Sequence, residues 1–90
     1  MQRNKSYKVK PLVICTKQLY GAVLFDVENR YSYHLNEHSL HIWNGYLKNL
    51  NVTQIVDSLM EFYEIKEQDA FDSVIQFTQQ MEEEGLLTTA

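Results

Sequence analysis

The chain has 90 residues, with 8 basic and 12 acidic side chains and a formal net charge of −4. A chain of this length makes one domain that buries roughly 60 to 65% of its unfolded surface, so it leaves little room for an enclosed active site. Five basic residues and no acid lie within residues 1–17, a charge of +5, and the remaining residues carry −9. This acidic body argues against nucleic acid and other phosphate-rich partners.

The start of the chain predicts neither a membrane span nor a signal peptide. No apolar run reaches the roughly 20 residues that cross a bilayer, and MQRNKSYKVK has no apolar middle. We therefore expect a cytoplasmic protein without membrane contact, a single domain over residues 1–90 in which residues 1–10 form a flexible basic arm. Cys15 is the only cysteine, which excludes an internal disulfide, and its apolar neighbours predict a buried packing role.

Residues 12–35 have the pattern of three antiparallel strands. The runs LVICT and AVLFD are rich in branched and aromatic residues, and KQLYG between them predicts a turn. DVENR predicts a second turn, with Asn29 in the left-handed conformation that asparagine tolerates. The third strand is residues 30–35, in which tyrosine alternates with polar residues.

Three helices are expected to follow. Asn36 is a suitable cap for the first helix, and Asn51 with Gln54 forms a capping-box pattern for the second. The third helix is predicted over residues 67–84 and ends at Gly85, after which Leu86 folds back over the last turn. The predicted buried residues of the first two helices are Leu40, Trp43, Leu47 and Leu50, and then Ile55, Val56, Leu59, Met60 and either Phe62 or Tyr63.

The third predicted helix has an apolar residue outside its main stripe. Its core-facing arc is Ala70, Phe71, Val74, Phe77, Thr78 and Met81. Ile75 projects to one side, where it either widens the buried face or floors a groove between this helix and a strand. Strands followed by helices predict an α+β domain in which the helices cover one face of a three-stranded antiparallel sheet and leave its edges open.

Signals for catalysis or metal binding are weak. His34, His38 and His41 recur at intervals of four and three, but His34 belongs to the predicted strand and no HExxH or paired CxxC motif supplies further ligands. No GxSxG motif or glycine-rich phosphate loop is present, and Cys15 has no adjacent base. We expect neither an enzyme nor a bound metal or cofactor.

Three segments carry a resemblance to a known family. GAVLFDVENRYSYHLNEHSLHIW, NVTQIVDSLMEFYEI and AFDSVIQFTQQMEEEGLL resemble the PqqD-like domain, the recognition element of pathways that make ribosomally synthesised, post-translationally modified peptides. The resemblance covers residues 12–87. It implies a winged-helix-like fold without catalytic activity, which binds the leader segment of a precursor peptide and presents it to a partner maturation enzyme.

The resemblance leaves the pathway open. A lasso peptide leader peptidase, which is a cysteine peptidase, is the favoured partner, and the alternatives are pyrroloquinoline quinone synthesis or a radical enzyme that cross-links peptides. Winged helices also bind DNA, but residues 67–84 carry six acids and no lysine or arginine, so this helix would repel phosphates.

The resemblance also implies a binding site. In the family, the leader adds a strand to the third strand and lies against the third helix. Matched onto this chain, the peptide-binding residues are Tyr31, Ser32, Tyr33, His34, Leu35, Phe71, Asp72, Ile75 and Gln79. The family often has an aspartate immediately before the position of Val74, where this chain has Ser73. An edge strand independently suits such a site, because its unpaired N–H and C=O groups can bond a peptide backbone.

Overall fold

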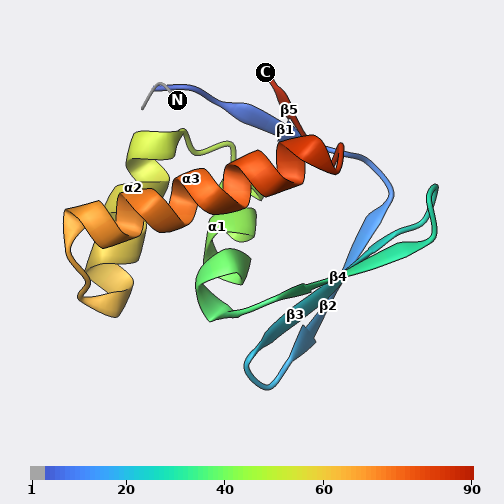
Figure 1. The fold of residues 1–90 in the computed structure, drawn as a ribbon, viewed down its shortest axis with the longest axis horizontal. Helices are drawn as coiled ribbons and strands as arrows, with labels where there is room; N and C mark the ends of the chain where they lie inside the picture. The colour runs from blue at the N-terminus through green and yellow to red at the C-terminus, as the bar shows by residue number, and fades with distance from the viewer. Residues whose placement is uncertain (1–3) are drawn as a thin grey trace.

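The computed structural model describes residues 4–90, which form strands and helices in the order shown in Figure 1. The elements are β1 (Tyr7–Val9), β2 (Val13–Gln18), β3 (Gly21–Asp26), β4 (Tyr31–Leu35), α1 (Glu37–Leu47), α2 (Val52–Tyr63), α3 (Glu67–Glu83) and β5 (Leu87–Thr89). β2, β3 and β4 form an antiparallel sheet in that order, and the three helices follow. The predicted α+β arrangement is confirmed, and its likeness to a winged helix is approximate.

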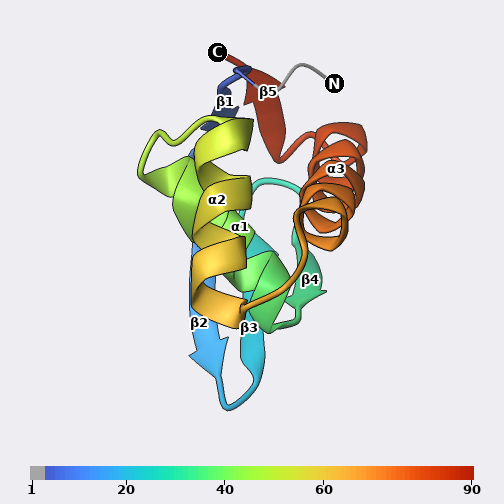
Figure 2. The ribbon, with the colours of Figure 1, turned by 90° about the vertical axis from the view of Figure 1, so that its left-hand side faces the viewer.

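Helices cover one face of this sheet. On β3, Ala22 and Leu24 are buried, whereas Val23 and Phe25 alternate with them on the other face. α1 packs against β3 and β4. Figure 2 shows α1 between α2 and α3, with β2 below α2 and β4 below α3. The sheet therefore has one covered face, one open face, and an edge strand close to α3.

The helix ends follow the signals in the sequence. The Asn36 side chain accepts a hydrogen bond from the Ser39 N–H at 2.8 Å, and Asn51 and Gln54 form the predicted capping box. Gly85 has a φ of +76°, which confirms the left-handed position after α3.

The buried faces of the first two helices differ in part from the prediction. On α1 the buried residues are Ile42, Trp43, Gly45 and Tyr46. Leu47 is 51% exposed, because at about 100° per residue it lies on a neighbouring flank of the helix. Phe62 of α2 is also exposed, and Tyr63 is half-buried. Cys15 is half-buried rather than buried, since it lies on an edge strand.

The turn before β4 is built around the buried carboxylate of Asp26. Its oxygens accept hydrogen bonds from the backbone N–H groups of Glu28 and Asn29, at 3.1 and 3.2 Å, and from the Asn29 side chain at 3.1 Å. The Lys10 ammonium lies 3.0 Å from the same carboxylate. Arg30, with a φ of 60°, takes the left-handed position that was predicted for Asn29, because Asn29 is held by Asp26. This network fixes where β4 begins.

The predicted arm over residues 1–10 is wrong for residues 7–9, and residues 1–3 lie outside the described part of the chain. β1 pairs antiparallel with β5, and the Tyr7 side chain is buried. The Tyr7 ring meets the Tyr46 ring edge-on at a centroid distance of 5.4 Å. The basic residues beside Tyr7 gave no sign in the sequence that its side chain is buried. The partner strand of β1 is β5, which lies at the other end of the chain.

Replacing Tyr7 with alanine should lower the free energy of unfolding by about 3 kcal/mol, the usual cost of removing a large buried ring. Urea unfolding at pH 7 measures this difference. Lys8→Ala, at the exposed neighbouring position of the same strand, should change the free energy by less than about 0.5 kcal/mol. Equal, small effects of both substitutions would show that β1 contributes nothing to the core.

Asp26→Asn should remove a pH-dependent part of the stability. Burial raises the pKa of the Asp26 carboxyl, but the bonds from Lys10 and from the N–H groups of Asn29 and Glu28 outweigh burial, so the net pKa lies below its ordinary value of 3.8. A carboxyl with a lowered folded pKa stabilises the fold at higher pH and loses that effect as the pH falls through the folded pKa. Unfolding experiments should therefore show a stability difference between wild type and variant at pH 7 that narrows below pH 3.8. A difference that stays constant with pH would contradict this role.

Candidate functional site

β4 is an edge strand whose outward-pointing backbone groups can be identified. The Val27 N–H donates to the Leu12 carbonyl at 3.1 Å, which makes this pair a hydrogen-bonded one. In an antiparallel ladder, hydrogen-bonded and non-bonded pairs alternate, so Ile14 and Phe25 are bonded to each other next. It follows that the backbone N–H and C=O groups of Phe25 point toward β2, and those of Leu24 point toward β4.

The same alternation fixes the groups of β4. Its register pairs Leu24 with Tyr33 and Asp26 with Tyr31, so these residues of β4 bond to β3. The N–H and C=O groups of Ser32 and His34 then point away from the sheet, toward the open edge. A peptide laid along β4 would therefore bond to the backbones of Ser32 and His34.

The side chains of β4 divide between the two faces of the sheet. Tyr31, Tyr33 and Leu35 share the helix-covered face, and the rings of Tyr31 and Tyr33 are 6.2 Å apart between centroids. Leu35 is buried, Tyr33 is half-buried and Tyr31 is 66% exposed. Ser32 and His34 are exposed on the open face. Both tyrosines therefore face the α3 side of the strand.

Tyr33 connects β4 to the end of α3. Its hydroxyl donates a hydrogen bond to the Glu84 carboxylate at 3.3 Å. Burial raises the pKa of the Tyr33 phenol, and the negative charge of Glu84 raises it further. The phenol therefore stays neutral at pH 7 and acts as a hydrogen-bond donor.

A polar cleft lies where β4 runs into α1. Its volume is about 250 Å³, and its walls come from the start of α1 and from one flank of α3. The lining residues are Asn36, His38, Ser39, Ile42, Ser73, Gln76, Phe77 and Gln80. Hydroxyl and amide groups dominate this list, so the cleft suits a ligand that brings its own donors and acceptors.

The predicted residues of α3 do not belong to this flank. Ser73, Gln76 and Gln80 line the cleft, and Glu84 continues the same flank to Tyr33. At about 100° per residue, Phe71 and Ile75 lie on the opposite side of the buried stripe, and Asp72 and Gln79 lie between the two flanks, away from the core. Glu82, on the flank of Ile75, lies against the Tyr7 phenol of β1. The structure therefore places Ser73, Gln76 and Gln80 on the flank of α3 that continues to Glu84 and Tyr33. Phe71 and Ile75 lie on the opposite flank, and Asp72 and Gln79 lie between the two.

Comparison with known proteins gives the family. The model for coenzyme PQQ synthesis protein D (PqqD) matches residues 21–87, which is most of the chain. The chain belongs to the PqqD family. The match begins at β3 and ends at β5, so it includes β4, its turn and all three helices.

Two solved structures share the fold of this PqqD-family chain. "TbiB1 in Complex with the TbiA(beta) Leader Peptide" is 18% identical with a TM-score of 0.79, covering 89% of this chain and 93% of that chain. "Lasso peptide synthetase B1 complexed with the leader peptide" is 20% identical with a TM-score of 0.80, covering 92% and 98%. No curated protein matches the sequence.

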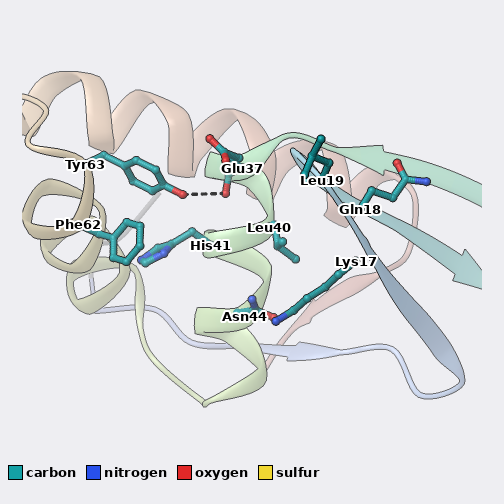
Figure 3. Close-up of a pocket in the computed structure, with 10 residues that line it drawn as sticks. Lys17, Gln18, Leu19, Glu37, Leu40, His41, Asn44, Phe62 and Tyr63 are labelled. Atoms are coloured by element: carbon teal, nitrogen blue, oxygen red, sulfur yellow. Dashed lines mark hydrogen bonds between the residues drawn. The ribbon is translucent and has the colours of Figure 1, made fainter.

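A second pocket, of about 270 Å³, lies on another flank of α1 in this PqqD-family domain (Figure 3). The tip of the β2–β3 hairpin, α1 and the end of α2 form it together. Its lining residues are Lys17, Gln18, Leu19, Gly21, Glu37, Leu40, His41, Asn44, Phe62 and Tyr63. The Tyr63 hydroxyl donates to the Glu37 carbonyl at 3.3 Å. Sequence analysis did not find this pocket, because three separate elements contribute to it.

His38 and His41 both pack near Tyr63, whereas His34 lies apart from them. His41 lies 2.7 Å from the Ser58 hydroxyl, and burial followed by the charges of Lys48 and His38 lowers the pKa of its ring. His38 packs edge-on against Tyr63, and His34 is on the open face of the sheet. Within residues 4–90, no three histidine, cysteine or acidic side chains are grouped as metal ligands would be.

None of the helices in this part of the chain is long and apolar enough to cross a membrane.

Glu84→Gln should lower the pKa of the Tyr33 phenol, because it removes the negative charge that opposes ionisation. The pKa should remain above the ordinary value of 10.0, since burial is the larger cause of the shift. Titration of tyrosine labelled with ¹³C at Cζ, followed by NMR, measures this change. Glu83→Gln is the matched control, and an equal response to both substitutions would contradict a specific contact between Tyr33 and Glu84.

Proposed function

We propose that this protein binds the leader segment of a ribosomally made precursor peptide, which adds as a strand to the free edge of β4. The open edge, with the backbone groups of Ser32 and His34 pointing outward, is the observation that carries this proposal. Family membership supports it, and so do two structures of the same fold that are complexes with leader peptides. The protein itself contributes binding and presentation, and a separate enzyme performs the chemistry.

Strand addition alone would give weak binding. The two outward residues of β4 can make up to four backbone hydrogen bonds, each worth about 0.5 to 1.5 kcal/mol net. A dissociation constant near 1 μM needs about 8 kcal/mol, so side-chain contacts must supply a substantial share. Backbone bonds would therefore set the position and direction of the leader, and pockets beside the strand would select its sequence.

The side-chain contacts would come from the covered side of β4 and from the α3 wall of the cleft. Alternate leader residues would face the rings of Tyr31 and Tyr33 on the covered side, next to Leu35. On the α3 side we assign the contacts to the flank of Ser73, Gln76 and Gln80, in place of Phe71, Asp72, Ile75 and Gln79. The amides of Gln76 and Gln80 can donate to and accept from a peptide without demanding one charge.

The pathway favoured is lasso peptide biosynthesis, with a leader-cleaving cysteine peptidase as the partner in the cytoplasm. One of the two solved structures of this fold is a lasso peptide synthetase B1, which supports this choice. Pyrroloquinoline quinone synthesis, the pathway for which the family is named, and the radical-enzyme pathways remain the alternatives.

Proline substitutions on β4 test the strand addition. Ser32→Pro and His34→Pro each remove an N–H that points outward, so the pairing with β3 is retained while one bond to the leader is lost. We expect each to weaken binding of a candidate precursor peptide, chosen from the reading frames near this gene, by about threefold to tenfold, as measured by fluorescence anisotropy. Lys17→Pro removes an outward N–H from the other edge of the sheet, at β2, and should leave the affinity unchanged. Equal affinities of all three variants and the wild type would contradict binding at β4.

The α3 assignment is tested by comparing two substitutions on opposite flanks. Gln80→Asp places a charge in the cleft and should weaken binding of the same precursor by about tenfold, because the bound leader would remove water from an unpaired charge. Ile75→Asp should have a smaller effect. The opposite order would support the site that was predicted from the sequence.

A further inference from the structure

The open face of the sheet carries an apolar patch near the turn that precedes β4. Ile14 of β2 and Phe25 of β3 are paired directly across the strands, and they are 55% and 36% exposed. Leu12 and Val27 lie just outside the paired ends of these two strands, joined by a backbone hydrogen bond, and they are 69% and 40% exposed. We call these four residues the open-face patch. Adjacent exposed apolar residues of this kind mark interaction sites more often than isolated ones do.

Polar residues of the same face surround the patch on one side. Ser32 of β4 is paired with Phe25, and farther along the sheet the half-buried Val23 lies between Thr16 and His34. An apolar centre with a polar border is the usual composition of a protein–protein interface. α1 packs against the covered face of β3 and β4, and none of the described elements packs on the open face.

The direction of a leader on β4 connects the patch to the proposed function. Every pairing within this sheet is antiparallel, and antiparallel pairing is slightly more stable per residue, so an added strand would run opposite to β4. β4 runs from Tyr31 to Leu35, and the leader would therefore enter beside Leu35 and leave beside Tyr31. Because the part of the precursor that is modified follows the leader, it would emerge at the Tyr31 end. Tyr31 is paired with Asp26, and Asp26 lies between the patch residues Phe25 and Val27 along the chain.

We propose that the open-face patch docks the maturation enzyme, which presents an apolar surface to Leu12, Ile14, Phe25 and Val27. This inference rests on the proposed leader binding at β4. An enzyme on the patch would sit at the end where the precursor leaves the strand, so that docking and substrate delivery occur at the same end of the sheet. Leader side chains on the covered side would meet Tyr31 and Tyr33, and those on the open face would lie beside Ser32 and His34, which separate them from the patch. Both partners can therefore bind together.

The opposite end of the sheet offers a clear contrast. The β2–β3 hairpin tip carries Leu19 and Tyr20, which are 84% and 75% exposed, beside the pocket that contains Phe62. A leader that ran parallel to β4 would deliver the precursor there instead. The two ends therefore provide matched apolar surfaces, of which only one fits antiparallel addition.

The experiment uses the full chain, a candidate precursor peptide and a candidate leader-cleaving cysteine peptidase, both chosen from the reading frames near its gene. Biolayer interferometry measures binding of the enzyme to the chain–precursor complex, and fluorescence anisotropy measures precursor binding separately. The double variant Ile14→Asp/Phe25→Ser should weaken enzyme binding by at least about tenfold and leave precursor affinity within about twofold. Leu12→Asp/Val27→Asp should act in the same way and replaces the first variant if that one fails to fold. Leu19→Asp/Tyr20→Ser is the matched control and should bind both partners as the wild type does.

Three outcomes would overturn the docking proposal. Enzyme binding that survives both patch variants would remove the patch as its site. Loss of enzyme binding in the hairpin-tip control alone would place the enzyme at the other end. A wild type that light scattering shows to be a dimer, and that the patch variants convert to a monomer with unchanged enzyme binding, would assign the patch to a second copy. Failure of the wild type to bind the precursor would instead refute the proposed function, so the two failures are distinguishable.

Discussion

Within residues 4–90, the backbone of β4 is hydrogen-bonded on one side only, and the proposed activity depends on this constraint. The backbone N–H and C=O groups of Tyr31, Tyr33 and Leu35 bond to β3. Antiparallel alternation turns the backbone groups of Ser32 and His34 outward. Edge strands of this kind readily accept another strand, and proteins usually cover or charge them. Here α3 lies close enough to β4 for Tyr33 to reach Glu84, and the edge remains open.

The rest of the molecule positions this edge. Asp26 stabilises the turn after which β4 begins. Asn36, which follows the last residue of β4, caps the first turn of α1. Tyr46 of α1 bonds to Thr78 of α3 across the core at 2.6 Å, which fixes the two helices that form the walls of the cleft. The far ends of the chain are tied by β1 and β5, with Tyr7 packed on Tyr46. Local capping and buried contacts together hold β4 and α3 at a fixed separation.

The sequence predicted those features that depend on neighbours along the chain. Strand alternation, the caps at Asn36 and Asn51, and the stop at Gly85 are local signals, and so is the position of β4 as the last strand of the meander. The side of α3 that faces β4 is a different matter. A helical wheel shows that Ile75 and Gln80 lie on opposite flanks of the core stripe, but only the packing of α3 on α1 determines which flank meets the sheet.

Features built from distant segments could not be read from the pattern. β1 is three residues long and depends on a partner strand at the other end of the chain, so no periodicity of the local sequence indicates this strand. The pocket around His41 joins a hairpin tip to two helices. Asn29 was a reasonable left-handed residue on propensity alone, but its side chain is engaged by Asp26, and Arg30 takes that conformation instead.

Amide hydrogen exchange with and without leader tests strand addition at β4 most directly. The ¹⁵N-labelled protein, saturated with the neighbouring precursor peptide, should show slowed exchange at the Ser32 and His34 amides, because the added strand bonds to them. The Cys15 and Lys17 amides, which point outward from β2, should exchange as fast as in the free protein. Tight binding of the precursor without any slowing at Ser32 and His34 would contradict the account.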